Sequence, residues 1–269
     1  MILSFCISFL LGIFSFTISD GIIPEKEYNY EADFFSTDGF GNLYIVQNSE
    51  LIKINTKDNK KLVYSNFSSG RISSIDPTDP FRILVYYKDF NRILFLDKNL
   101  TEIISPISLD DKGIYNVVSV CQSVNGGFWV LDQNSAQLLY LDKHLNIVKK
   151  SAVIKEIFDQ NTGANQAFML EKNDYIYVGF ENAGVMQFDS YGVYIKTFPS
   201  INIANFQVID NVIVYYSDGK LYYYNTQNYQ EENVKIPIEN IKKVTIEGNK
   251  LFVQTEKKIL VYNLNKLKE

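Results

Sequence analysis

Ile93-Leu-Phe-Leu-Asp97 is one of six short apolar segments in this chain that end in Asp or Asn. The end residues of neighbouring segments lie between 36 and 47 positions apart (225−189 and 189−142). A recurrence of about 40 residues built from strand-like units is typical of β-propellers and similar arrays. The other five segments are Leu51-Ile-Lys-Ile-Asn55, Leu138-Leu-Tyr-Leu-Asp142, Val185-Met-Gln-Phe-Asp189, Leu221-Tyr-Tyr-Tyr-Asn225 and Ile259-Leu-Val-Tyr-Asn263.

Each segment is preceded by a second apolar run, such as Phe128-Trp-Val-Leu131, with glycine or asparagine turns often ahead of it. A further strand-like stretch lies before those turns, at residues 33–37, 72–76, 117–121, 167–170, 206–209 and 244–247. A fourth follows the Asp or Asn at residues 61–64, 101–104, 147–150 and 194–198. Four antiparallel strands per repeat make one propeller blade. The sequence therefore predicts an all-β, six-bladed β-propeller with four antiparallel strands in each blade.

The last repeat has no fourth strand of its own, because only six residues follow Asn263. At the other end of the chain, polar residues alternate with tyrosine or alanine within residues 26–32, and this stretch belongs to none of the six repeats. We predict that this N-terminal stretch supplies the outer strand of the last blade and so covers an exposed sheet edge. No linker interrupts the series, so residues 20–269 are predicted to form a single domain.

The Asp or Asn at the end of each third strand is predicted to close a turn, because its side chain accepts hydrogen bonds from backbone N–H groups two residues later. These residues are therefore interpreted as scaffold. Cys121, inside an apolar run, is interpreted as a buried structural thiol, and His144 as a turn residue. In the long connection at residues 151–166, the spacing of Val153, Ile154, Ile157 and Phe158 is compatible with a helical turn.

Residues 1–19 carry no charged side chain and are almost all apolar. This stretch is interpreted as a secretory signal peptide that is cleaved after Ser19. The alternative is an uncleaved anchor, since the stretch is close to the length that spans a bilayer. Removal of the signal would leave Cys121 as the only cysteine, and no disulfide within the chain would then form.

The overall charge and the motif content exclude several classes of function. The formal net charge is −5, which argues against a nucleic-acid binder because such a protein needs a basic face. With one histidine, the chain has no pattern of a metal site, and it contains no phosphate-binding loop and no nucleophile motif. We therefore predict no catalytic residues, no metal and no cofactor.

Two sets of residues are candidates for binding. Arg71, Lys88, Asp89 and Arg92 are expected to lie on one rim of the second blade, opposite the rigid turns at Asp76-Pro77 and Asp79-Pro80, and a charged rim held in this way suits a protein partner. Asp89, Asp132 and Glu181 each follow the second strand of a blade, and they are candidates for protein binding as well.

An enzyme or a lectin is the alternative to a protein-binding module. Glycoside hydrolysis needs two inward carboxylates, and Asp89, Asp132 and Glu181 are the acids that a shared position in the repeat can bring to one face. The Tyr-rich stretch at residues 215–224 is a further candidate for stacking on a sugar, although alternating tyrosines also suit half-buried strands.

The stretch at residues 70–90, with its Ser-Ser-Ile-Asp-Pro-Thr-Asp-Pro and Tyr-Tyr-Lys-Asp elements, resembles a family of exported β-propeller proteins of Bacteroidota with NHL-like repeats. Gly41-Asn-Leu-Tyr-Ile-Val46, Leu51-Ile-Lys-Ile54, Phe128-Trp-Val-Leu-Asp132 and Leu139-Tyr-Leu-Asp142 carry the rest of the resemblance. Bacteria of this phylum use the type 9 secretion system, whose outer-membrane translocon has a periplasmic plug subunit. The resemblance thus implies a non-enzymatic periplasmic propeller that binds another protein, such as that translocon, and meets the membrane only through it.

Overall fold

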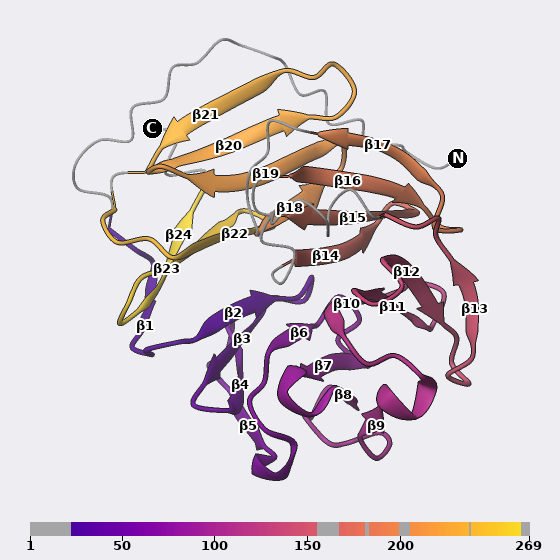
Figure 1. Cartoon of the computed structure of the whole chain (residues 1–269). Coiled ribbons are helices and arrows are strands. Elements are labelled where there is room, and N and C mark those ends of the chain that lie inside the picture. Colours follow the sequence, from indigo (N-terminus) through magenta and orange to yellow (C-terminus); the bar gives the residue numbers. More distant parts are fainter. Residues whose placement is uncertain (1–22, 155–166, 181–182, 199–204, 237, 265–269) are drawn as a thin grey trace, which may run out of the picture.

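The computed structural model describes residues 23–154, 167–180, 183–198, 205–236 and 238–264. Within these residues the chain forms six four-stranded antiparallel sheets arranged around a common centre, as Figure 1 shows. The prediction of an all-β, six-bladed propeller is confirmed. No helix of the described residues is long and apolar enough to cross a membrane.

The first three blades follow one another along the chain. Blade I contains β2 (Phe34–Thr37), β3 (Asn42–Gln47), β4 (Glu50–Asn55) and β5 (Lys61–Ser65). Blade II contains β6 (Ser74–Asp76), β7 (Ile83–Tyr87), β8 (Arg92–Leu96) and β9 (Ile107–Ser108). Blade III contains β10 (Val117–Gln122), β11 (Phe128–Asp132), β12 (Gln137–Leu141) and β13 (Ile147–Lys150). Short 3-10 helices η1 (Phe67–Ser69), η2 (Lys88–Phe90) and η3 (Asp110–Lys112) lie in their connections.

The last three blades complete the ring. Blade IV contains β14 (Ala167–Lys172), β15 (Tyr175–Phe180), β16 (Gly184–Asp189) and β17 (Tyr194–Phe198). Blade V contains β18 (Phe206–Ile209), β19 (Val212–Ser217), β20 (Lys220–Asn225) and β21 (Glu231–Lys235). Blade VI contains β22 (Lys243–Glu247), β23 (Lys250–Gln254) and β24 (Ile259–Asn263), with β1 (Lys26–Tyr28) as its outer strand.

Strand β1 closes the ring as predicted. It pairs antiparallel with β24, with Lys26 opposite Val261 and Tyr28 opposite Ile259, so the indigo N-terminal strand lies beside the yellow C-terminal one in Figure 1. The side chain of Gln254 adds a bond from its Nε2 to the carbonyl oxygen of Ala32, 2.7 Å away. Both ends of the described chain are therefore held in one blade, and the edge of β24 is covered.

The hydrophobic core lies between the blades. The buried residues form six clusters, and each cluster joins two neighbouring blades. Strand β7 shows why: Ile83, Val85 and Tyr87 pack towards blade I, whereas Leu84 and Tyr86 pack towards blade III. Because successive side chains of a strand point to opposite faces, an inner strand that is apolar throughout serves two blade boundaries at once.

The Asp and Asn residues that end the third strands close turns, as predicted. The Oδ1 atom of Asp97 accepts bonds from the N–H groups of Asn99 and Thr101, both at 2.8 Å. Asp142 and Asp189 accept the same pair of bonds in blades III and IV. In each of these three carboxylates the Oδ1 atom is thus used to hold the turn, which agrees with a structural role.

The outer strand of blade II differs from the prediction. Residues 101–104 do not form a regular strand; only a single bridge joins Glu102 to Leu96, and the outer strand β9 lies further on, at Ile107–Ser108. Pro106 provides a physical reason, since a proline has no N–H group to donate to the ladder and interrupts it.

Cys121 and His144 lie in the surroundings that the sequence predicts for them. Cys121 is fully buried, and burial raises the pKa of its thiol well above the usual value, as suits a structural cysteine. His144 lies exposed in the turn that Asp142 closes. The signal peptide at residues 1–19 and the helical turn predicted around Ile157 and Phe158 lie outside the described residues.

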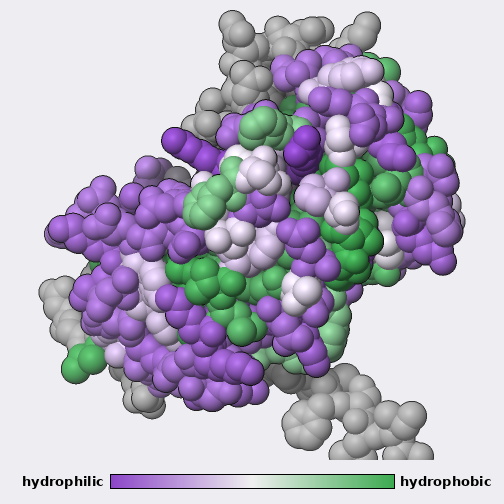
Figure 2. Space-filling model, turned by 90° about the horizontal axis from the view of Figure 1, so that it is seen from below, coloured by the Kyte–Doolittle hydropathy of each residue, from purple (hydrophilic) through white to green (hydrophobic). Residues whose placement is uncertain are grey.

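Figure 2 views the propeller from below, towards the edge where β5 and β9 lie in Figure 1. Hydrophilic residues cover much of this side, and hydrophobic residues gather in its middle. Exposed apolar side chains of the outer segments of blades I and II include Val63, Ile103 and Ile104. Single exposed apolar residues of this kind are normal on a protein surface and assign no function by themselves.

Candidate functional site

The antiparallel blades give the propeller two ends that differ in construction. At the first end lie the turns between the first and second strands and between the third and fourth strands of each blade. At the second end lie the turns between the second and third strands and the connections from one blade to the next. The charged rim of blade II and Asp132 belong to the second end, whereas the Pro77 and Pro80 turns belong to the first.

The predicted rim residues of blade II do lie together at the second end. The backbone N–H of Arg71 is 3.5 Å from Oδ2 of Asp89, and the N–H of Lys88 donates to Oγ of Ser73 at 3.0 Å. The guanidinium of Arg92 lies 5.7 Å from the centre of the Phe90 ring. Arg71, Lys88 and Asp89 are exposed and Arg92 is half-buried, so the rim is accessible, and its part in protein binding stays a prediction.

A glycine allows this rim to form. Gly70 has a φ of +85°, a conformation that L side chains rarely adopt, and a Cβ atom at this position would lie 2.9 Å from the Phe90 ring. The segment that carries Arg71 can therefore lie directly against η2, which carries Asp89.

Two of the three acids of the alternative hypothesis lie in the described residues, and each forms its own separate contacts. Asp132 is buried and accepts bonds from the N–H of Ser135 at 2.9 Å and from its hydroxyl at 2.6 Å, so it closes its own turn. Asp89 approaches Arg71 within blade II. Glu181 lies outside the described residues. No observation places Asp89 and Asp132 as a catalytic pair, and the enzyme hypothesis gains no support from them.

The tyrosines of blade V are packing residues. The rings of Tyr215 and Tyr222 stack with their centres 4.8 Å apart, and the hydroxyl of Tyr215 donates to Glu231 at 2.5 Å. Burial raises the pKa of Tyr223 to about 12. Each tyrosine from Tyr215 to Tyr224 is buried or half-buried, so this stretch presents no open stacking surface for a sugar.

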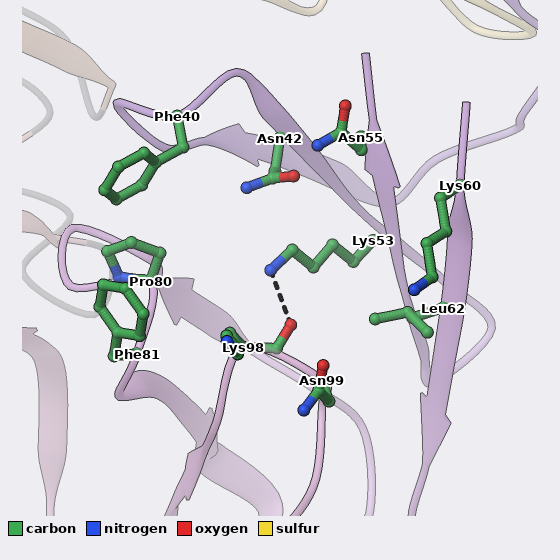
Figure 3. A pocket seen from close by; sticks show the side chains of 10 residues that line it. All are labelled: Phe40, Asn42, Lys53, Asn55, Lys60, Leu62, Pro80, Phe81, Lys98 and Asn99. Atoms are coloured by element: carbon green, nitrogen blue, oxygen red, sulfur yellow. Dashed lines mark hydrogen bonds between the residues drawn. The ribbon is translucent and has the colours of Figure 1, made fainter. Parts of the chain in front are cut away.

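The first end holds a groove between blades I and II, and the sequence did not predict it. Its volume is about 250 Å³. Side chains from five separate segments line it, as Figure 3 shows. They are Phe40, Asn42, Lys53, Asn55, Lys60, Leu62, Pro80, Phe81, Lys98 and Asn99.

One wall of the groove is the turn between β2 and β3, which a buried carboxylate holds in shape. Asp38 accepts bonds from the N–H groups of Phe40 and Asn42, both at 3.0 Å, and from the Nδ2 of Asn42 and the hydroxyl of Tyr44, both at 2.7 Å. Burial, with the bond to Asp38 as a second cause, raises the pKa of Tyr44. These bonds hold the backbone of the turn that carries Phe40, and more than half of Phe40 is exposed at the mouth of the groove.

The opposite wall is the double turn between β6 and β7, the stretch around the two Asp-Pro pairs. Asp79 accepts a bond from the N–H of Phe81 at 2.9 Å. Arg82 ties the turn to blade III, because its Nη1 donates to the carbonyl oxygen of Gly126 at 2.9 Å. The exposed Phe81 ring meets Phe40 edge to face, with the ring centres 6.1 Å apart. Two exposed aromatic rings from neighbouring blades therefore form a pair on a rigid frame.

The floor and the outer side of the groove are basic. Lys53 points from β4 across the groove, where its Nζ donates to the carbonyl oxygen of Lys98 at 2.8 Å (Figure 3). Burial lowers the pKa of Lys53. Lys60 and Lys98 are exposed. The only salt bridge among the described residues joins Lys258 to Glu27, so neither ammonium group has a carboxylate partner there.

Comparisons with known proteins identify the fold and go no further. No protein-family model and no curated protein match the chain. A streptogramin B lyase structure matches with a TM-score of 0.61 and 13% identity, over 89% of this chain and 86% of that chain. A chain of the mitotic checkpoint complex matches with a TM-score of 0.63 and 9% identity, over 93% of this chain and 97% of that chain.

A third structure, PorZ of Porphyromonas gingivalis, described as a bacterial surface component of the type-IX secretion system, matches with a TM-score of 0.47 and 13% identity. The match covers 88% of this chain and 38% of that chain, and it is too weak to carry an argument. The class of protein is therefore a six-bladed β-propeller. Because this fold occurs both in a lyase and in a multiprotein complex, function has to be argued from the surface of this chain.

Proposed function

We propose that this chain is a non-enzymatic propeller that binds another protein in the periplasm. More specifically, we propose that it is a plug or accessory subunit of the outer-membrane translocon of type 9 secretion. This part of the proposal rests on the apolar stretch at residues 1–19 and on the family resemblance. The observation that carries the binding function is the exposed pair Phe40 and Phe81, which meet edge to face on two hydrogen-bonded turns. The lysines beside them form no salt bridge among the described residues. Aromatic side chains, phenylalanine included, are enriched at the cores of protein interfaces relative to the rest of the surface.

Affinity purification of an epitope-tagged chain from native membranes tests this function. We expect a stable partner that includes an outer-membrane protein. A double variant Phe40→Ser, Phe81→Ser should lose most of that partner, whereas Val63→Ser, which changes an equally exposed apolar residue on the outer strand of blade I, should keep it. Recovery of the chain alone under cross-linking conditions would overturn the proposal.

The same purification separates the two ends of the propeller. The variant Arg71→Glu changes the charged rim at the second end and leaves the aromatic pair unchanged. A loss of partner in this variant alone would place binding at the rim, and a loss in the Phe40 and Phe81 variant alone would place it at the groove. In either outcome the protein-binding function stands.

A further inference from the structure

The groove between blades I and II combines features that select a particular kind of partner. Three lysines and three asparagines alternate with Phe40, Leu62, Pro80 and Phe81, and no acidic residue is part of the lining. This contrasts with the chain as a whole, whose formal net charge is −5. Lysine side chains that line a groove without an acidic residue among them attract a negatively charged ligand and disfavour a positive one.

None of these lysines forms a salt bridge with a carboxylate among the described residues, although the charges of Asp38 and Asp97 act on Lys53. Asp97 uses its Oδ1 atom to hold the N–H groups of Asn99 and Thr101, and Asp58 accepts the N–H of Lys60 at 2.9 Å. Both acids therefore serve their own turns. The Nζ atoms of Lys60 and Lys98 have no hydrogen-bond partner among the described residues, so their ammonium groups are available to a ligand.

The groove also offers neutral hydrogen-bond donors. The Oδ1 atom of Asn55 accepts the N–H of Lys57 at 2.9 Å, and its Nδ2 group has no partner among the described residues. The side chain of Asn99 has none there either. Amide groups that line an open groove can donate to the carbonyl oxygens of an extended backbone.

The size of the groove favours part of a larger molecule. Its volume of about 250 Å³ lies below the roughly 300–1,000 Å³ of sites that enclose a small molecule or a cofactor. The aromatic pair lies at one side of the groove and the exposed lysines lie at the other. A ligand that contacts both sides needs an apolar group and, some distance from it, negative charges. An extended acidic peptide with an aromatic or aliphatic residue meets both requirements.

We infer that the groove between blades I and II binds an acidic, extended segment of a partner protein, with an apolar side chain against Phe40 and Phe81 and carboxylates against Lys60 and Lys98. This inference rests on the proposed protein-binding function and adds the chemical class of the partner segment. Lys53 supports the site from below by fixing the turn that carries Lys98.

Fluorescence anisotropy with a labelled synthetic peptide tests the inference on the full chain. The probe contains glutamates on both sides of one phenylalanine, and matched peptides carry glutamine in place of glutamate or alanine in place of phenylalanine. We expect the acidic probe to bind and each matched peptide to bind at least about fivefold more weakly, with affinity for the acidic probe falling as salt rises through screening. Equal binding of the glutamine peptide would overturn the inference.

Substitutions locate the binding. The double variant Lys60→Glu, Lys98→Glu should weaken binding of the acidic probe by about tenfold or more, since it replaces two attractions with two repulsions. Lys57→Glu, an exposed residue of the same turn outside the groove lining, should leave it within about twofold. Thermal unfolding should match the wild type in both variants. Unchanged binding in the double variant, or equal competition by inorganic sulfate at the probe's concentration, would overturn the inference.

Failure of this inference differs from failure of the proposed function. If the double variant still recovers the native partner in full from membranes, the protein-binding function holds and the acidic-segment assignment is wrong. If the wild-type chain recovers no partner at all, the proposed function is wrong.

Discussion

Lys149 donates a hydrogen bond from its Nζ to the backbone carbonyl oxygen of Ser190, 2.6 Å away, and so joins the outer strand of blade III to the turn of blade IV. The acceptor directly follows Asp189, one of the residues that end the third strands. Three other lysines donate in the same way to the backbone carbonyl oxygen of a residue that follows such an Asp or Asn. From outer strands, Lys196 donates to Thr226 and Lys26 donates to Thr56. From a third strand, Lys53 donates to Lys98. The Asp and Asn turns thus receive lysines from the neighbouring blade at four boundaries.

Lys149→Met should lower the free energy of unfolding by about 1–2 kcal/mol. The substitution removes the bond to Ser190 and the contacts of the ammonium group with the rings of Tyr140 and Tyr191, whose centres lie 4.9 and 5.1 Å away. Methionine keeps most of the apolar stem, so lost packing contributes little. Urea unfolding measures the change.

The matched control is Lys150→Met, at the next residue of the same strand, which is exposed. A surface substitution of this kind should stay within about 0.5 kcal/mol. Equal effects of the two variants would show that the lysine bonds between blades contribute nothing to stability.

Glu171 holds the boundary between blades III and IV from the inside. It is buried, and its two oxygens accept bonds from Nε1 of Trp129 at 2.8 Å and from the N–H of Val124 at 3.2 Å. Glu171→Leu should cost about 1–3 kcal/mol, because it leaves the buried Nε1 of Trp129 and the partly buried N–H of Val124 without their acceptor, and Glu171→Gln should cost less because it keeps one acceptor. Trp129 is the only tryptophan, so its fluorescence reports unfolding at this boundary.

Glu232→Leu is the control for that series, since Glu232 is an exposed residue of an outer strand. It should leave the unfolding midpoint almost unchanged. If Glu171→Leu unfolds at the same urea concentration as the wild type, the bonds of Glu171 to Trp129 and Val124 do not stabilise the boundary.

The repeat made most of the fold predictable. The apolar runs that end at residues such as Asp97 gave the number of blades, and the missing fourth strand after Asn263 indicated that β1 would close the ring. Both features are local in sequence, because alternation along a strand and the chemistry of a turn depend on a few neighbouring residues. The one misplaced strand, at residues 101–104, fell where Pro106 breaks the ladder.

The groove was not predictable in the same way. Phe40 and Phe81 are 41 positions apart (81−40) and meet because two blades pack at a particular angle, which no periodicity in the sequence records. Lys53 lies inside one of the repeated apolar segments, and nothing in that pattern indicates that its side chain reaches across to the next blade. Sequence patterns placed the charged rim around Arg71 and Asp89 correctly because those residues lie at the ends of adjacent strands of one blade.

Removal of residues 23–30 should destabilise the whole propeller rather than blade VI alone. Strand β1 covers the edge of β24, and its loss exposes a row of unpaired backbone groups that can pair with another molecule. We expect a lower unfolding midpoint together with dimers or larger species in size-exclusion chromatography.

Lys258→Ala serves as the control for the truncation, because it removes only the exposed salt bridge to Glu27 and leaves the strand pairing intact. Exposed ion pairs contribute about 0–1 kcal/mol, so this variant should behave like the wild type. A truncated chain that remains monomeric with an unchanged midpoint would show that β1 is not needed to close the ring.

Lys243 makes the free energy of unfolding depend on pH, and a single substitution of this residue can isolate that dependence. Its Nζ donates to the carbonyl oxygen of Phe35 at 2.9 Å, and no carboxylate pairs with it among the described residues. Burial lowers the pKa of Lys243 from 10.5 to about 8. Between these two values the unfolded chain binds more protons than the folded chain, so the contribution of Lys243 to the free energy of unfolding rises with pH across that window. Below pH 8 both states are protonated and the contribution is constant.

Urea unfolding of the wild type and Lys243→Met at a series of pH values tests this sign, since titrations shared by the two chains cancel in the difference. We expect the difference to stay flat below about pH 8 and to shift in favour of the wild type from there to about pH 10.5. Lys242→Met, at the exposed neighbouring residue, should show no such shift. A flat difference over the whole range would mean that Lys243 titrates in the folded chain as it does in the unfolded one.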